Sequence, residues 1–124
     1  MAKPTKSRVT NYEQYSVFSG SPAECSHHLI YGRFGAWRDF SEKWGLKIPL
    51  LNREHNMSSK GNVYQIHNNP AAESLSKICG QLAYERIYLA EKLANGEKLG
   101  HQSAEDWLNE AREDFRRQIG ESFL

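Results

Sequence analysis

The stretch CSHHLIYG, residues 25–32, places two histidines, His27 and His28, next to an apolar pair. Its composition favours a β-strand over residues 25–31. Successive side chains of a strand point to opposite faces of the sheet. The two imidazoles would therefore lie in different surroundings, and one of them would face the interior of the protein.

Further short elements are expected on both sides of this strand. LKIPLL, residues 46–51, reads as a second strand, and NREHNMSS, residues 52–59, as a short helix with Asn52 as its N-cap. YSVF, residues 15–18, suits another strand, because a turn-like SGSPAE follows it. Residues 32–45 mix glycines, aromatic residues and charges without a clean period, so we expect mostly loop there, with a helical turn near the end.

The C-terminal half predicts two helices. Asn69 before Pro70 is a helix-start signal, and Asn95–Gly96 ends the first helix. Ser103 is expected to cap the second helix, with Asp106 in a position like that of a capping box. The apolar residues expected to face the core are Leu75, Ile78, Cys79, Leu82, Ala83 and Ile87 in the first helix, and Trp107, Leu108, Ala111, Phe115 and Ile119 in the second.

The bulk properties bound the class of protein. A length of 124 residues predicts one domain, and we divide the chain into a flexible basic arm over residues 1–14 and a domain over 15–124. Within the domain, a core unit over residues 15–69 precedes a helical part over 70–124. The class is α+β, with a short β-hairpin followed by two C-terminal α-helices. The net charge of +1 neither demands nor excludes nucleic acid as a partner.

The mean hydropathy of −0.73 and the lack of a long apolar run argue against a membrane partner. The N-terminus carries no apolar signal segment, and the chain has two cysteines, Cys25 and Cys79. Two cysteines cannot form a disulfide framework, so a reducing cytoplasm is the expected location. The sequence indicates no oligomeric state.

Four of the five histidines, His27, His28, His55 and His67, fall in the irregular half of the chain. Neutral imidazole is a common ligand of transition metals, and three imidazoles with open positions would suit a catalytic metal. A fourth histidine could then act as a general base. The spacings match no tight motif, however, and a histidine taken alone is more often a surface or hydrogen-bonded residue.

The order HHLIYG, SEKWGLKIPLL, EHNMSSKG, IHNN, GQLAYE, IGESFL runs through nearly the whole chain from residue 16. This order resembles small HNH-type endonucleases of phages and prophages. The resemblance implies a ββα-metal site with one divalent ion, Mg²⁺, Mn²⁺, Ni²⁺ or Zn²⁺. By position, His27, His55 and His67 match metal ligands, and His28 matches the general base.

The chain departs from the family at the structural zinc site. Relatives hold that zinc with two pairs of ligands, which align with Ser16 and Ser19 and with Leu51 and Glu54. Serine is a poor zinc ligand and leucine is none. We therefore expect no structural zinc, and we expect these four residues to lie near one another with local packing in place of the ion.

A second departure concerns the central asparagine of the HNH motif, which should fall between His28 and the second strand. No asparagine occurs there. Asp39 and Ser41 are the candidates for the hydrogen bond that braces this loop. The loss could instead weaken or abolish catalysis.

The implied partner is DNA, whose phosphates are bound mainly by Lys and Arg side chains. Six basic residues flank the motif histidines and are the candidates for DNA contacts: Arg33, Arg38, Lys43, Lys47, Arg53 and Lys60. The leading interpretation is a metal-dependent endonuclease that hydrolyses DNA phosphodiester bonds in the cytoplasm of a bacterial host. The alternative is an inactive HNH scaffold that binds or regulates DNA or another protein.

Overall fold

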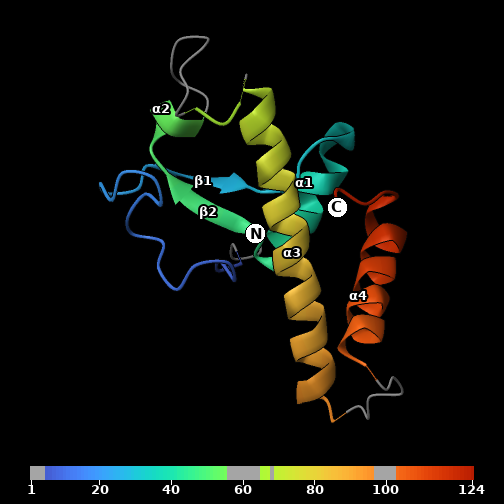
Figure 1. The fold of residues 1–124 in the computed structure, drawn as a ribbon. Coiled ribbons are helices and arrows are strands. Elements are labelled where there is room, and N and C mark those ends of the chain that lie inside the picture. The colour runs from blue at the N-terminus through green and yellow to red at the C-terminus, as the bar shows by residue number, and fades with distance from the viewer. Residues whose placement is uncertain (1–4, 56–64, 68, 97–102) are drawn as a thin grey trace.

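The computed structural model describes residues 5–55, 65–67, 69–96 and 103–124 (Figure 1). In these ranges, an antiparallel pair of short strands is combined with helices, and the chain ends in two helices, as the sequence predicted. The elements in chain order are β1 (Cys25–His28), η1 (Arg33–Gly35), α1 (Ala36–Trp44), β2 (Lys47–Leu50), α2 (Asn52–His55), α3 (Pro70–Ala94) and α4 (Ala104–Ile119).

The pairing of β1 with β2 fixes where the adjacent histidines point. His27 lies opposite Ile48, and His28 lies opposite Lys47. Residues that face each other across an antiparallel pair project to the same side, and neighbours along a strand project to opposite sides. His27 therefore lies on one face of the hairpin and His28 on the other.

The strand predicted over residues 15–18 is wrong. Tyr15 forms only an isolated bridge with Pro22. The N–H of Ser16 donates to Ser21 O at 2.8 Å, and the N–H of Gly20 donates to Ser16 O at 2.9 Å. These bonds close a tight turn, so the turn chemistry of the serines and Gly20 prevails over the apolar residues of YSVF.

The loop predicted over residues 32–45 is also wrong for most of its length, because α1 occupies residues 36–44. Both ends of α1 are glycines in the left-handed region, Gly35 at φ 93° and Gly45 at φ 68°. Glycine adopts this conformation without the penalty that a Cβ brings. Gly35 therefore caps the start of α1 and Gly45 caps its end, and neither glycine lies inside the helix.

The start signals of the two long helices are confirmed. The side chain of Asn69 accepts a hydrogen bond from Ala72 N at 3.3 Å, with Pro70 as the first helical residue. The hydroxyl of Ser103 accepts one from Asp106 N at 3.2 Å. The first helix ends at Asn95 as its C-cap, as expected.

The core lies between α1, α3 and α4, and it is built from Ile30, Trp37, Leu46, Tyr84, Ile87, Phe115 and Ile119. On α4, the predicted inner positions Ala111, Phe115 and Ile119 are confirmed, whereas Leu108 is 50 % exposed. On α3 the predicted apolar stripe is right in part: Ile87 is buried in the core and Ala83 packs against it, whereas Leu75 is 60 % and Leu82 is 51 % exposed. Cys79 is exposed as well.

Small and polar residues also contribute to the buried face of α3, alongside Tyr84 and Ile87. Ser76, Gly80, Gln81 and Tyr84 point inward. A Cβ on Gly80 would lie 2.6 Å from Ile30 Cγ1, so the helix can approach the segment directly after β1 this closely only with glycine at this position. This close approach brings the first turns of α3 alongside the hairpin.

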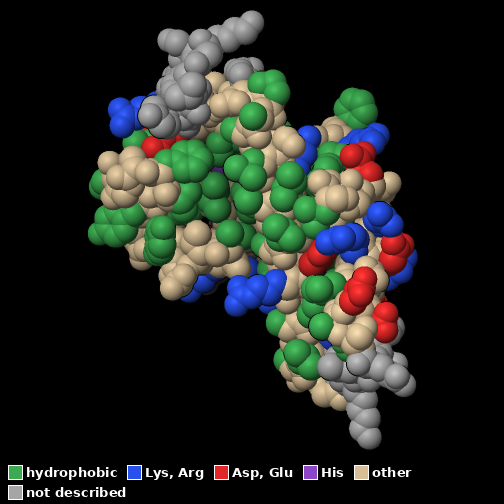
Figure 2. Space-filling model, in the orientation of Figure 1, with side chains coloured by type: hydrophobic (Ala, Val, Ile, Leu, Met, Phe, Trp, Pro, Cys, Tyr) green, Lys and Arg blue, Asp and Glu red, His purple; other side chains and the backbone are tan. Residues whose placement is uncertain are grey.

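The displaced apolar side chains form an open groove on the surface. Leu75 and Cys79 line it together with Phe18 and Ile48, and Figure 2 shows apolar side chains gathered over the hairpin and the adjoining part of α3. None of the helices in the described ranges combines the length and hydrophobicity that crossing a bilayer requires.

The described part of the predicted N-terminal arm, residues 5–14, makes hydrogen bonds with the domain. Arg8 N donates to Gly45 O at 2.8 Å, and Ser7 Oγ donates to Lys47 O at 2.7 Å. Thr5 N donates to a carboxylate oxygen of Glu42 at 2.8 Å. These bonds place residues 5–8 against α1 and β2, while the division of the chain at residue 14 and the flexibility of the arm stay predictions.

Candidate metal centre

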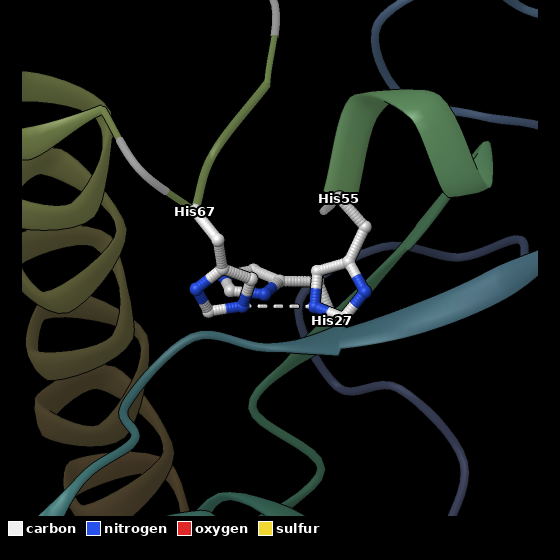
Figure 3. A group of neighbouring side chains, drawn as sticks. All are labelled: His27, His55 and His67. Carbon is white, nitrogen blue, oxygen red and sulfur yellow. Dashed lines mark hydrogen bonds between the residues drawn. The ribbon is translucent and has the colours of Figure 1, made fainter. Parts of the chain in front are cut away.

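Three histidines from separate parts of the chain converge, as Figure 3 shows. His27 comes from β1, His55 from the end of α2, and His67 from the segment before α3. One ring nitrogen of each lies within 4.8 Å of the others, and the two Nε2 atoms of His55 and His67 are 3.0 Å apart. The juxtaposition that the sequence predicted for these three residues is therefore confirmed.

Backbone hydrogen bonds hold His55 and His67 side by side. Ile66 N donates to Glu54 O at 2.8 Å, and His67 N donates to His55 O at 3.0 Å. α2 begins at Asn52, but the N–H groups of Glu54 and His55 both donate to Leu51 O, and the predicted residues 56–59 lie outside the described residues. Leu51 is thus the N-cap rather than Asn52, and the Glu54 carboxylate accepts from Leu51 N at 2.8 Å as in a capping box.

Burial favours the neutral form of two imidazoles of the cluster, those of His27 and His55. His27 is 1 % exposed, and burial, together with the neighbouring His55, His67 and His28, lowers its pKa to about 3. Burial and the nearby histidines also lower the pKa of His55 to about 4. A metal ion binds the neutral form of histidine. These two rings are therefore in the form that can ligate a metal at neutral pH.

Residues of α3 and the end of the hairpin surround the cluster. Ser76 Oγ lies 2.8 Å from His27 Nε2, and Glu73 Oε2 lies 3.5 Å from His67 Nδ1. The ring of Tyr31 packs edge-on against His67, with 4.7 Å between centroids. Burial and Glu73 raise the pKa of the Tyr31 phenol, which therefore stays protonated at neutral pH.

Sequence reasoning missed Glu73, Ser76 and Tyr31. The available signal was the spacing of Glu73 and Ser76, which are three residues apart directly after a recognisable helix start. Such a pair lies on one face of the first two turns. That face adjoins His67, which precedes the helix by three residues.

Acid should destabilise the metal-free protein through His27. In the folded protein the pKa of His27 is about 3, below the ordinary histidine value of 6.5. As the pH falls, the unfolded chain therefore takes up a proton at His27 before the folded protein does. The contribution of neutral His27 to the free energy of unfolding is fully present above pH 6.5 and is lost as the pH falls from 6.5 to about 3. From pH 6.5 to about 5, His27 alone should remove about 2 kcal/mol from the free energy of unfolding.

Urea unfolding of the metal-free wild type at the two pH values measures this change. A His27→Gln variant, which does not titrate, should show a smaller decrease over the same interval. An identical pH dependence in both proteins would show that the pKa of His27 is the same in the folded and unfolded chains.

Ser16, Ser19, Leu51 and Glu54, which the sequence resemblance aligns with zinc ligands of HNH-type endonucleases, lie together, as predicted. Ser16 Oγ is 2.5 Å from Glu54 Oε1, and Leu51 N donates to the same oxygen. Ser19 takes part through its backbone N–H, which donates to Ser16 Oγ at 3.2 Å. Ser16 and Glu54 are both buried, so a hydrogen-bonded pair joins the two segments here.

Ser41 braces the chain after β1. Its hydroxyl accepts from Ile30 N at 3.0 Å and donates to Ile30 O at 2.7 Å, and the residue is fully buried. Asp39, the other candidate, is exposed on α1. Of the two residues proposed in place of the missing asparagine, Ser41 makes the bracing contact.

His28 does not join the cluster. On the opposite face of the hairpin, its Nε2 lies 2.9 Å from Glu42 Oε1, and Lys47 Nζ lies 3.1 Å from Glu42 Oε2. Burial alone would raise the pKa of Glu42, but hydrogen bonds from His28, Thr5 N and Lys47 lower it to about 2. The arrangement in which His28 faces substrate beside the metal is therefore not found, and its assignment as general base rests on the sequence resemblance alone.

The six basic residues predicted to contact DNA differ in their exposure to solvent. Arg33, Arg38, Lys43 and Arg53 are exposed, on η1, α1 and α2. Lys47 is 5 % exposed and paired with Glu42, so its assignment as a DNA contact is corrected. Lys60 lies outside the described residues. Lys77, which the sequence reading omitted, lies with Nζ 5.1 Å from the centroid of Tyr31 and so adjoins the cluster.

No family model, no curated protein and no solved structure matches the chain. The likeness to HNH-type endonucleases rests on the sequence motifs quoted above. The geometry of the three histidines is a separate observation, and it concerns the positions that those motifs singled out.

Proposed function

We propose that this protein is a metal-dependent DNA endonuclease of the HNH type, in which His27, His55 and His67 hold one divalent ion. The observation that carries the proposal is the convergence of these rings, with ligand atoms within 4.8 Å of one another. They come from the first strand of a hairpin, the short helix after its second strand, and the following segment. This is the order of elements that a ββα-metal site implies.

The ligand atoms, three imidazole nitrogens, favour some divalent ions over others. Imidazole nitrogen suits Zn²⁺ and Ni²⁺, whereas Mg²⁺ prefers oxygen ligands and retains several waters. Three protein ligands leave positions open for water and substrate, as in catalytic sites. When bound, such an ion lowers the pKa of water and neutralises phosphate charge.

The surroundings supply further groups for a phosphodiester substrate. The ring of Tyr31, whose phenol oxygen is buried, lies beside the cluster. Lys77 lies against the same ring, and the exposed Arg53 is two residues before His55. We propose these cations as contacts to the DNA backbone, because such contacts position a duplex without reading its sequence.

One observation favours the alternative of an inactive binding module. His28, which the resemblance assigns as general base, is bound by Glu42 on the far face of the hairpin. Among the described residues, the group that could hold an ion contains only these three histidines, and the one carboxylate noted beside them, that of Glu73, contacts the Nδ1 of His67. A scaffold that kept the metal site without a base would bind DNA and leave it uncut.

Plasmid cleavage separates the two functions. Purified protein is incubated with supercoiled plasmid and Mg²⁺, Mn²⁺, Ni²⁺ or Zn²⁺, with and without EDTA. We expect nicked or linear DNA with Ni²⁺ or Zn²⁺, none with EDTA, and none with His55→Ala. Asn52→Ala, an exposed change on the same helix, is the matched control and should cut like the wild type. DNA binding and metal binding without cleavage under any ion would favour the binding module.

A further inference from the structure

We propose that the first two turns of α3 form the outer shell of the metal site, in which Ser76 fixes the tautomer of His27 so that Nδ1 is the ligand atom, and Glu73 orients His67. This inference rests on the proposed function, since it assumes that the three histidines hold an ion. The inference goes beyond the proposed function, because it names the ligand atoms of His27 and His67 and two residues that position these rings.

Hydrogen-bond accounting at Ser76 determines the tautomer of His27. Ser76 Oγ lies 2.8 Å from the backbone oxygen of Leu29 and 2.8 Å from His27 Nε2. A carbonyl oxygen can only accept, so the single hydroxyl hydrogen of Ser76 goes to Leu29. Ser76 must then accept from His27, which places the ring proton on Nε2 and the lone pair on Nδ1.

The other nitrogen of His27 is left without a partner. Its Nδ1 is buried, and no described residue makes a hydrogen bond with it. A buried acceptor without a partner is unusual in a folded protein and calls for an explanation. The ring faces His55 and His67, with centroids 5.0 and 5.2 Å away, so an ion among the three rings would use this lone pair (Figure 3).

Glu73 favours one tautomer of His67, as Ser76 does for His27. Its carboxylate lies 3.5 Å from His67 Nδ1 and favours a proton there. The lone pair of His67 is then on Nε2, the atom that lies 3.0 Å from His55 Nε2. A carboxylate that holds the far nitrogen of a histidine ligand is a recurring outer-shell arrangement, and it raises the basicity of that ligand.

Both positioning residues come from one helix. Glu73 and Ser76 are three residues apart on α3 and so lie on one face of it. The same face continues into Gly80, whose missing side chain lets the helix approach Leu29 and Ile30, directly after β1. Docking of α3 therefore sets the orientation of a ligand from β1 and of a ligand from the segment before the helix.

The first test uses the metal-free wild type and nitrogen-15 NMR of the imidazole rings, which distinguishes the protonated nitrogen from the one with the lone pair. We expect His27 to carry its proton on Nε2 at neutral pH. A proton on Nδ1 would overturn the inference, and this measurement needs no variant. In Ser76→Ala the preference for that tautomer should be lost, whereas Ser74→Ala, an exposed change on the same helix, should leave it intact.

The second test measures affinity for Zn²⁺ and for Co²⁺, each added alone, by competition with a chelator. Ser76→Ala and Glu73→Gln should each bind about 10–100-fold more weakly, the usual effect of losing an outer-shell partner. The Co²⁺ absorption spectrum should change as well, since it reports the ligand geometry. Ser76→Thr, which keeps the hydroxyl, should restore both, and Ser74→Ala and Glu105→Gln should match the wild type.

The outcomes separate this inference from the proposed function. A wild type that binds an ion while Ser76→Ala and Glu73→Gln bind it equally well overturns the outer-shell roles and leaves the proposed function standing. A wild type that binds neither Zn²⁺ nor Co²⁺ overturns the proposed function and the outer-shell roles with it. Circular dichroism and thermal unfolding establish that each variant is folded.

Discussion

Replacing His67 by alanine should lower the affinity for Zn²⁺ or Ni²⁺ by about 10²–10³-fold. A tightly held structural zinc ion contributes on the order of 10 kcal/mol of binding free energy, and three imidazoles would share it. Losing one third, about 3 kcal/mol, corresponds to that factor in the dissociation constant. The remaining pair, His27 and His55, would still bind, but weakly.

Competition with a chelator of known affinity measures the change. His28→Ala is the matched control, because it removes an adjacent histidine from the opposite face of the hairpin. Its metal affinity should equal that of the wild type. If His67→Ala keeps wild-type affinity, the ion is held elsewhere on the chain and the cluster is not its site.

The sequence predicted those parts of the fold that depend on local chemistry. Asn69, Pro70 and Ser103 mark helix starts because their side chains or rings act within one turn, and both starts are confirmed. The strands around His27 and Ile48 were recognisable for the same reason. In each case the deciding interactions lie within a few residues of one another.

The prediction failed in part for α3, where contacts between residues far apart in the sequence determine which face of the helix is buried. Leu75, Cys79 and Leu82 form an apolar stripe, but the inner face of α3 is set by Gly80, which alone permits contact with Ile30. Burial of Gln81 depends on a hydrogen bond to Phe123 N, 42 positions along the chain. Hydrophobic periodicity contains neither fact, so it placed Ile87 correctly in the core but put the exposed Leu75, Cys79 and Leu82 on the buried face.

The candidate site was predicted in part. The motif order singled out His27, His55 and His67, and the structure brings them together. The roles of Ser76 and Glu73 could not be predicted from that order, because they arise from the docking of α3 onto the hairpin. The position of His28 followed from strand alternation, but its partner Glu42 lies on a helix that the sequence reading took for a loop.

The adjacent histidines should differ sharply in a cleavage assay. His27→Ala removes the most buried ring of the cluster, and we expect ion-dependent cleavage of plasmid to fall to background. His28→Ala breaks a contact with Glu42, which keeps hydrogen bonds from Lys47 and Thr5 N, so the variant should fold and cut at nearly the wild-type rate. Removing a general base costs about 10²–10⁴-fold in rate.

Single-turnover nicking rates at saturating ion, with metal content measured on the same samples, decide between the two roles of His28. A rate near that of the wild type is expected, because Glu42 holds the imidazole on the face away from His27. A loss of about 10²–10⁴-fold with metal content unchanged would instead make His28 the general base. The hairpin would then have to turn that ring towards the ion when DNA binds, and Glu42→Gln, which weakens the competing contact, should raise the rate.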